Sequence, residues 1–198
     1  MPELFGEDPA MGVEIAVFAV FLSIAAVIAV YAIRTGITPM PTGARVGAAM
    51  LDLMRPNGPG TIYELGSGWG TLTVPIAKRF PECRVVGFEL SPLPWITSKF
   101  LKAIGGAANL SLRRENFFKA DLSDAAMIVC YLNTRTMKKL QPKLEAELKP
   151  GTLIVSHFFA FRGWTPIEER VVGHVIRSPV YVYRIEAADS VSVSEKLN

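Results

Sequence analysis

The residues best suited to chemistry lie in the stretch "IYELGSGWGTLT", residues 62–73. Three glycines, Gly66, Gly68 and Gly70, alternate with other residues behind the acid Glu64. Glycine permits a positive φ and lets a ligand approach the backbone closely. The loop follows a strand-like segment and opens a helix-like one, which is the context in which glycine-rich loops bind nucleotides. The stretch therefore predicts a nucleotide-type ligand at the end of a strand.

The spacing of this loop is acid-x-G-x-G-x-G, which differs from the G-x-G-x-x-G fingerprint that brings a pyrophosphate to a helix N-terminus. A carboxylate at Glu64 would repel a pyrophosphate, but it suits an ammonium group. A second acid, Glu89, ends the next strand-like segment nineteen residues after Gly70. There it can accept hydrogen bonds from both hydroxyls of a ribose. An amino-acid ammonium, a ribose and an adenine without phosphate describe S-adenosylmethionine.

Strand-like and helix-like segments alternate along most of the chain, after a helical pattern at 44–54 for which Thr42 is a candidate cap. The predicted strands are 61–65, 83–90, 110–116, 125–132 and 151–161, and the predicted helices are 70–80, 94–106 and 134–148. We expect Pro142 to interrupt the last helix. Alternation with apolar strands predicts an α/β fold whose parallel sheet has helices on both faces. Segments 168–178 and 180–186 predict a closing antiparallel pair.

The motifs "YELGSGWG" and "VVGFELSP" resemble those of class I S-adenosylmethionine-dependent methyltransferases, and the resemblance covers roughly residues 46–185. It implies a Rossmann-like sheet. A longer block, "ENFFKADLSDAAMIVCYLNTRTMKKLQPKLEAELKPGTLIVSHFFAFRGWTP", follows a single apolar N-terminal segment. This arrangement is similar to the membrane-anchored lysine methyltransferases of the ATP synthase c-subunit and the adenine nucleotide translocase, and to their prokaryotic relatives.

The resemblance implies roles for the matching residues. The methionine end of the cofactor would be held by Glu64, Gly66, Ser67, Gly68 and Gly70, and the ribose by Glu89 with Leu90 beside it. Asn116 stands where the family has an acid that binds the adenine amino group, and its carbonyl oxygen can accept the same hydrogen bond. Phe117 would stack near the adenine. Pro41 and Thr42, in the segment "TPMPT", are candidate lid residues.

A lysine acceptor must lose its proton before methyl transfer, and an apolar, aromatic pocket lowers its pKa. Residues at the ends of the fourth and fifth strands are candidates to line that pocket, and they are Tyr131, Asn133, Ser156, His157, Phe159 and Trp164. We expect catalytic roles for Tyr131, Asn133, His157 and Trp164. His157 could accept a proton, although a half-buried structural histidine explains it equally well, and Trp164 could serve packing alone. The two cysteines and two histidines lack the spacing of a metal site, so no metal is expected.

The N-terminal segment 15–33 contains nineteen residues without a charge. As a helix it would be about 28 Å long, close to the ~30 Å hydrocarbon core of a bilayer. The first 33 residues contain four acids and no Lys or Arg, unlike a signal peptide. All 21 Lys and Arg follow, with the other 14 acids, which leaves a net charge of +7. The positive-inside rule then predicts a single-pass protein of a prokaryotic inner membrane, with its N-terminus outside and its domain in the cytoplasm.

The expected organisation is a short extracytoplasmic N-terminus at 1–14, a membrane span at 15–33, a linker or lid at 34–45, a methyltransferase domain at 46–186 and a polar tail at 187–198. The expected substrate is a lysine of a membrane protein. The only other expected partner is the bilayer, through the span, and no nucleic acid is expected. Methylation of a lipid or quinone head group is an alternative, and so is a cofactor-binding scaffold without catalysis. The oligomeric state is left open.

Overall fold

The computed structural model describes residues 9–35, 42–173 and 177–186. The chain divides into two compact units, Met1–Thr38 and Pro39–Asn198. The first unit contains α1 (Pro9–Thr35). Its segment Ala10–Ile33, of 24 residues, has the length and the apolar composition of a helix that could cross a membrane. A signal sequence near an N-terminus passes the same test, so the membrane span stays a prediction.

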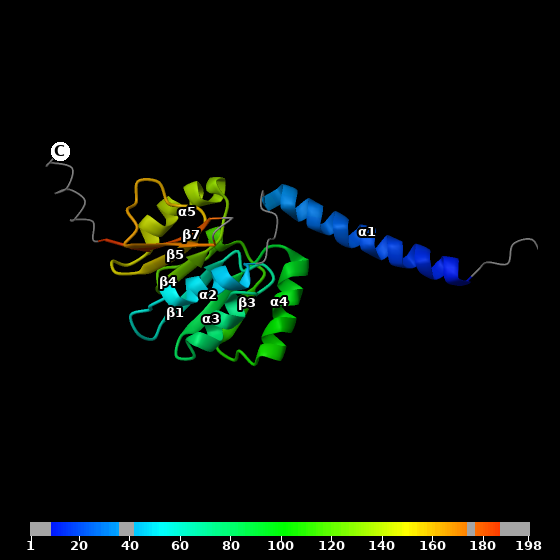
Figure 1. Ribbon diagram of the computed structural model, residues 1–198, viewed down its shortest axis with the longest axis horizontal. Helices are drawn as coiled ribbons and strands as arrows, with labels where there is room; N and C mark the ends of the chain where they lie inside the picture. Colours follow the sequence, from blue (N-terminus) through cyan, green and yellow to red (C-terminus); the bar gives the residue numbers. More distant parts are fainter. Residues whose placement is uncertain (1–8, 36–41, 174–176, 187–198) are drawn as a thin grey trace, which may run out of the picture. The chain divides into compact units, whose positions relative to one another are not determined.

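The second unit contains a seven-stranded sheet in the order β3-β2-β1-β4-β5-β7-β6 (Figure 1). The strands are β1 (Thr61–Leu65), β2 (Arg84–Phe88), β3 (Leu110–Arg113), β4 (Ala125–Cys130), β5 (Leu153–His157), β6 (Glu168–Val172) and β7 (Ser178–Arg184). The first five are parallel, β7 runs antiparallel to β5, and β6 runs antiparallel to β7. The predicted closing antiparallel pair is therefore confirmed. The strand order reverses between β1 and β4, which is where open α/β sheets bind ligands.

The helices of this unit are α2 (Ala44–Leu53), α3 (Thr73–Arg79), α4 (Pro92–Gly105) and α5 (Thr134–Glu147), with a short 3-10 helix, η1 (Phe117–Lys119). The expected interruption of α5 at Pro142 is wrong, because the helix continues through it. Met137, Leu140 and Leu144 are buried on both sides of the proline. This apolar face holds both halves of the helix against the sheet, and the Pro142 ring faces solvent.

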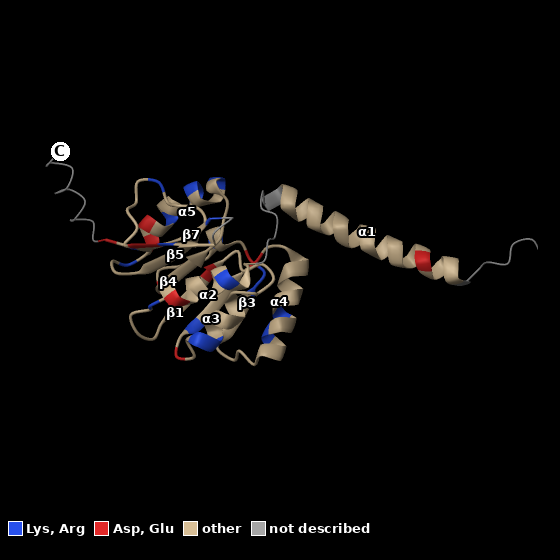
Figure 2. Ribbon diagram, in the orientation of Figure 1, with Lys and Arg blue, Asp and Glu red and all other residues tan. Residues whose placement is uncertain are grey.

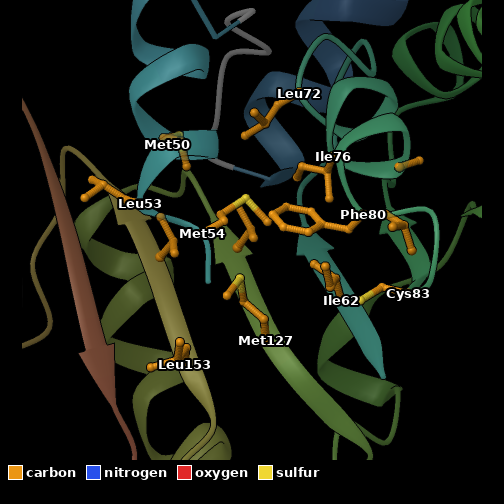
Figure 3. Packing of buried hydrophobic residues seen from close by; sticks show 14 of the residues in the cluster. Met50, Leu53, Met54, Ile62, Leu72, Ile76, Phe80, Cys83, Met127 and Leu153 are labelled. Carbon is orange, nitrogen blue, oxygen red and sulfur yellow. The ribbon is translucent and has the colours of Figure 1, made fainter. Parts of the chain in front are cut away.

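The hydrophobic core lies on both faces of the sheet because strand side chains alternate. On one face Ile62 and Met127 pack with residues of α2, α3 and the turns that flank these helices (Figure 3). The packed residues of the helices and turns are Met50, Leu53, Met54, Leu72, Ile76 and Phe80. On the other face Cys130 contacts Met137 of α5, with 3.9 Å between the sulfur atoms. Cys130 and Cys83 are both buried. Helices thus cover the sheet on both faces, as predicted.

The register of the strands decides which residues meet at their ends. Leu65 of β1 is paired with Phe88 of β2 and with Cys130 of β4, and Cys130 is paired with Ser156 of β5. The residues that follow these strands therefore lie along one border of the sheet, which we call the carboxyl edge.

Candidate active site

The three glycines of the loop all have a positive φ, at 79° for Gly66, 53° for Gly68 and 81° for Gly70. Their surroundings differ. A Cβ on Gly70 would lie 2.8 Å from the Cβ of Ser98 in α4, and one on Gly66 would lie 3.0 Å from Leu132. A Cβ on Gly68 would meet nothing within 4 Å. Gly70 therefore lets α4 pack closely, and the loop leaves open space only at Gly68.

The backbone N–H groups of the loop are already engaged. Those of Gly66 and Ser67 donate to the carbonyl oxygen of Phe88, at 2.9 and 2.8 Å, and that of Gly68 donates to Oε2 of Glu89 at 2.9 Å. A phosphate-binding loop directs such groups at the anion instead. The loop is thus tied to the end of β2, and it suits a ligand without phosphate.

The side chain of Ser67 is buried, and its Oγ has no hydrogen-bond partner within the described part of the chain. It lies over Gly87 of β2, where an added Cβ would come within 3.0 Å of that Oγ. The structure therefore turns Ser67 inward, so its side chain shapes the loop beneath the predicted cofactor site. Sequence reasoning missed Gly87, although a glycine inside a strand signals such a close approach.

Glu64 lies at the end of β1, is 6% exposed and accepts a hydrogen bond from the Thr73 hydroxyl. The pKa of Glu64 is raised to about 8, mainly by burial. The hydrogen bond from Thr73 lowers this pKa, and the negative charge of Glu89 raises it further. Among the described residues no cation contributes to this pKa, and a buried carboxylate in such surroundings gains most from a ligand that brings a positive charge. Glu64 thus fits the ammonium end of S-adenosylmethionine.

Glu89 is half-buried just after β2, and two backbone N–H groups orient its carboxylate. Gly68 donates to Oε2 at 2.9 Å, and Ser91 donates to Oε1 at 2.6 Å. Each carboxylate oxygen keeps a further lone pair that can accept a hydroxyl hydrogen bond. The fixed orientation fits recognition of a ribose, and Leu90 beside it is 37% exposed and offers an apolar surface.

Asn116 begins η1, and its Oδ1 accepts a hydrogen bond from the backbone N–H of Phe118 at 3.0 Å. The same oxygen keeps a lone pair for an adenine amino group. Phe117 is 7% exposed, and its ring packs on that of Phe118 with 4.6 Å between centroids. Phe117 therefore offers little surface for stacking, whereas the half-buried Phe118, which sequence reasoning missed, offers more.

Of the two candidate lid residues, Pro41 lies outside the described residues. Thr42 precedes α2, and its methyl group faces Gly47, 3.9 Å from a Cβ built there. It does not cap the helix, because Gly43 occupies the N-cap position without a side-chain hydrogen bond. The structure thus places Thr42 beside the first turn of α2.

Tyr131 and His157 meet at the carboxyl edge, where their ring centroids are 4.2 Å apart. His157 is 5% exposed, and its Nε2 is 2.8 Å from the hydroxyl oxygen of Ser178. Its Nδ1 has no partner among the residues that the structure describes. Burial lowers the pKa of His157 to about 4, so the ring is neutral at pH 7. A buried imidazole with this pKa is a weak base, and His157 acts as the support for Tyr131.

Phe158 was missed by sequence reasoning, because nothing in a sequence marks a phenylalanine with a positive φ. Its φ is 69°, its side chain is 42% exposed, and its N–H donates to the Pro179 carbonyl at 2.7 Å. The ring meets His157 and Phe159 edge-on, at 6.2 and 5.1 Å between centroids. Strained backbone of this kind gathers at functional sites. Tyr131, His157, Phe158 and Phe159 form what we call the aromatic cluster.

Of the two other expected catalytic residues, Asn133 follows β4 at the carboxyl edge, whereas Trp164 lies elsewhere. Asn133 caps α5, since its Oδ1 accepts the N–H of Thr136 at 2.8 Å. Trp164 packs on Tyr183 at 5.8 Å between centroids and donates to Glu145 at 3.0 Å. Tyr183 is paired with Ile154, near the start of β5, whereas His157 ends that strand. Trp164 therefore lies away from the carboxyl edge.

Across residues 9–35, 42–173 and 177–186, no group of three or more His, Cys, Asp or Glu side chains could hold a metal ion. The open space at Gly68 and the buried Glu64 fit S-adenosylmethionine instead. The sheet order and this site define a class I S-adenosylmethionine-dependent methyltransferase.

Comparison with solved structures supports this class. An RNA methyltransferase from Salinibacter ruber, in complex with S-adenosyl-L-homocysteine, superposes with a TM-score of 0.67 at 30% sequence identity, over 74% of this chain and 94% of that one. A precorrin-6y C5,15-methyltransferase from Geobacter metallireducens shares the fold, with a TM-score of 0.58 at 16% identity, over 75% of this chain and 94% of that one.

The profile of the ANTKMT methyltransferase domain matches residues 64–168. A protein-lysine N-methyltransferase of Saccharolobus islandicus is 34% identical over 153 residues, which cover 74% of this chain and 92% of that protein. The adenine nucleotide translocase lysine N-methyltransferase of Mus musculus is 28% identical over 68% of this chain and 58% of the mouse protein. The chain belongs to the ANTKMT methyltransferase family.

Proposed function

We propose that this chain is a membrane-anchored protein-lysine N-methyltransferase whose substrate is a membrane protein. The observation that carries the proposal is the 34% identity to an archaeal protein-lysine N-methyltransferase across 92% of that protein. The apolar helix α1 supports the anchor, and the basic charge that follows it supports a cytoplasmic domain at a prokaryotic inner membrane. Anchoring would raise the local concentration of substrates in the same bilayer.

When bound, S-adenosylmethionine supplies an electrophilic methyl group on a sulfonium. The chain's residues place it: Glu64 pairs with the ammonium, and Glu89 accepts hydrogen bonds from the ribose. The aromatic cluster excludes water beside the acceptor, so an entering lysine loses its proton to solvent more readily. The Tyr131 phenol oxygen can accept a hydrogen bond from the amine and aim its lone pair. His157, neutral and buried, holds the Tyr131 ring and adds no charge that would repel an ammonium.

The test uses full-length protein and radiolabelled S-adenosylmethionine, added to membranes and ribosomes of cells that lack the gene. The products are separated into protein, lipid and RNA, and the protein is hydrolysed to amino acids. We expect label as methyl-lysine in a membrane protein. The Gly68→Arg variant, designed to prevent cofactor binding, serves as the blank. Label in the lipid fraction would support the head-group alternative, and label in RNA would match the activity of the RNA methyltransferase from Salinibacter ruber. Either result, or none above the blank, would overturn the proposal.

A further inference from the structure

Helix α4 presents large apolar side chains to solvent. Ile96, Phe100 and Ile104 recur every four residues, so they lie on one face of the helix. They are 56%, 64% and 69% exposed, whereas the buried residues of α4 are Pro94 and Ser98. An ordinary surface helix has the opposite arrangement, with its large apolar side chains against the core. We call Ile96, Phe100 and Ile104 the α4 stripe.

The charged side chains on α4 itself are all positive, whereas Glu89 precedes the helix and the exposed Glu115 follows Arg114. Helix α4 carries Lys99 and Lys102 and no acidic residue (Figure 2). Strand β3, which contacts α4, ends at the exposed Arg113, and the exposed Arg114 follows. Lys99 is exposed and extends over the ring of Trp95, at 4.7 Å from its centroid. Apolar residues flanked by basic ones are the composition of helices that lie in the interface of an anionic bilayer.

We infer that the α4 stripe docks onto the surface of an anionic bilayer, with Ile96, Phe100 and Ile104 at the boundary between head groups and acyl chains. The inference rests on the proposed membrane anchor. Eight residues separate α1 from α2, and they span at most about 28 Å, so a bilayer crossed by α1 is within reach of the domain. Charge complementarity favours this occupant over a second copy of a chain that is itself basic.

Docking of α4 would also place the reaction. The helix begins at the carboxyl edge, where Ser91, its N-cap, donates to the carboxylate of Glu89. A bilayer contact along α4 therefore holds the cofactor site close to the membrane surface. Lysines of membrane proteins lie at that depth, since their ammonium groups extend to the interface.

The experiment uses full-length protein in nanodiscs of phosphatidylcholine and phosphatidylglycerol. An environment-sensitive fluorophore is attached to single introduced cysteines, and the native Cys83 and Cys130 are buried. Phe100→Cys reports on the stripe, Lys138→Cys on exposed α5, and Ser23→Cys on α1. Quenching is measured with nitroxide lipids and with aqueous acrylamide. We expect the label at position 100 to be quenched by lipid and to be about tenfold less accessible to acrylamide than the label at 138.

The outcomes separate this inference from the anchor on which it rests. Lipid quenching at position 23 with acrylamide quenching at position 100 would overturn the docking of α4 and leave the anchor standing. Acrylamide quenching at position 23 would overturn the anchor itself, and the docking inference with it. Protection of position 100 from both quenchers would mean that protein covers the stripe, either a second copy or α1, and would also overturn the inference.

A matched pair of variants tests the contribution of charge. Lys99→Gln with Lys102→Gln removes two charges from α4, and Lys138→Gln with Lys139→Gln removes two from α5. Each basic residue near an anionic surface favours binding about fivefold. We expect docking to weaken about tenfold or more in the α4 pair and to be unchanged in the α5 pair. Equal effects of the two pairs would mean that only net charge matters, which would contradict a docked α4.

Discussion

The buried carboxyl of Glu64 makes the stability of the domain depend on pH. Its pKa is about 8 in the folded protein, mainly because of burial, against 4.5 for an unburied glutamate. Between these values the folded state holds a proton that the unfolded state has lost. Stability therefore falls as pH rises from 4.5 to 8, by about 1.4 kcal/mol per pH unit, and stays level above 8.

Glu64→Gln removes this dependence while it keeps an oxygen that accepts the Thr73 hydrogen bond. Between pH 6 and pH 8 the stability of the variant relative to the native protein should rise by about 2 kcal/mol, because the carboxyl is half ionised at pH 8. For a domain of this size that corresponds to roughly 5 to 10 °C in Tm. Tryptophan fluorescence of full-length protein in detergent during heating would measure it, with the exposed Glu82→Gln as control. A Tm difference that is constant between pH 6 and 8 would refute the reasoning.

The same carboxyl links cofactor binding to proton release. At pH 7 Glu64 is protonated in the free protein, and pairing with a ligand ammonium lowers its pKa. We expect native protein to release about one proton per S-adenosylhomocysteine bound. Titration calorimetry in two buffers of different ionisation enthalpy counts these protons. Glu64→Gln should bind more weakly and release almost none, and equal proton release by both proteins would place the ammonium elsewhere.

Three further predictions concern the site. Gly68→Arg should abolish cofactor binding measured by calorimetry. The control is Gly106→Arg, because Gly106 has a similar φ of 65° and open surroundings, and this variant should only destabilise the domain. Retained cofactor affinity in Gly68→Arg would show that the loop does not bind the cofactor. Glu89→Ala should lower cofactor affinity more than Asn116→Ala, since it removes a charged acceptor worth about 1.5–3 kcal/mol, and the reverse order would contradict the placement of the ribose. Tyr131→Phe should reduce kcat about tenfold or more and leave cofactor affinity unchanged; an unaltered kcat would remove Tyr131 from the reaction.

Much of the fold and of the cofactor site could be predicted from the sequence, because both depend on the order and spacing of residues within short segments. The alternation of apolar strands with helices predicts the sheet, and the glycine loop after β1 predicts where the cofactor lies. Glu64 is the second-last residue of β1 and Glu89 directly follows β2, and parallel strands place their carboxyl ends at the same edge. The uncharged apolar segment at residues 15–33 likewise predicts the helix α1. In each case the spacing of a few neighbouring residues was sufficient.

Tertiary structure decided what each side chain faces. Ser67 turns inward onto Gly87, and His157 is too buried to be a strong base. Trp164 packs at the wrong end of β5, and the stripe that includes Phe100 faces solvent although its periodicity is that of a core helix. The physical reason is that burial, pKa and strain depend on what packs against a residue from distant parts of the chain. A sequence period states that a helix has an apolar face, but only the packed fold determines whether that face meets the core or the solvent.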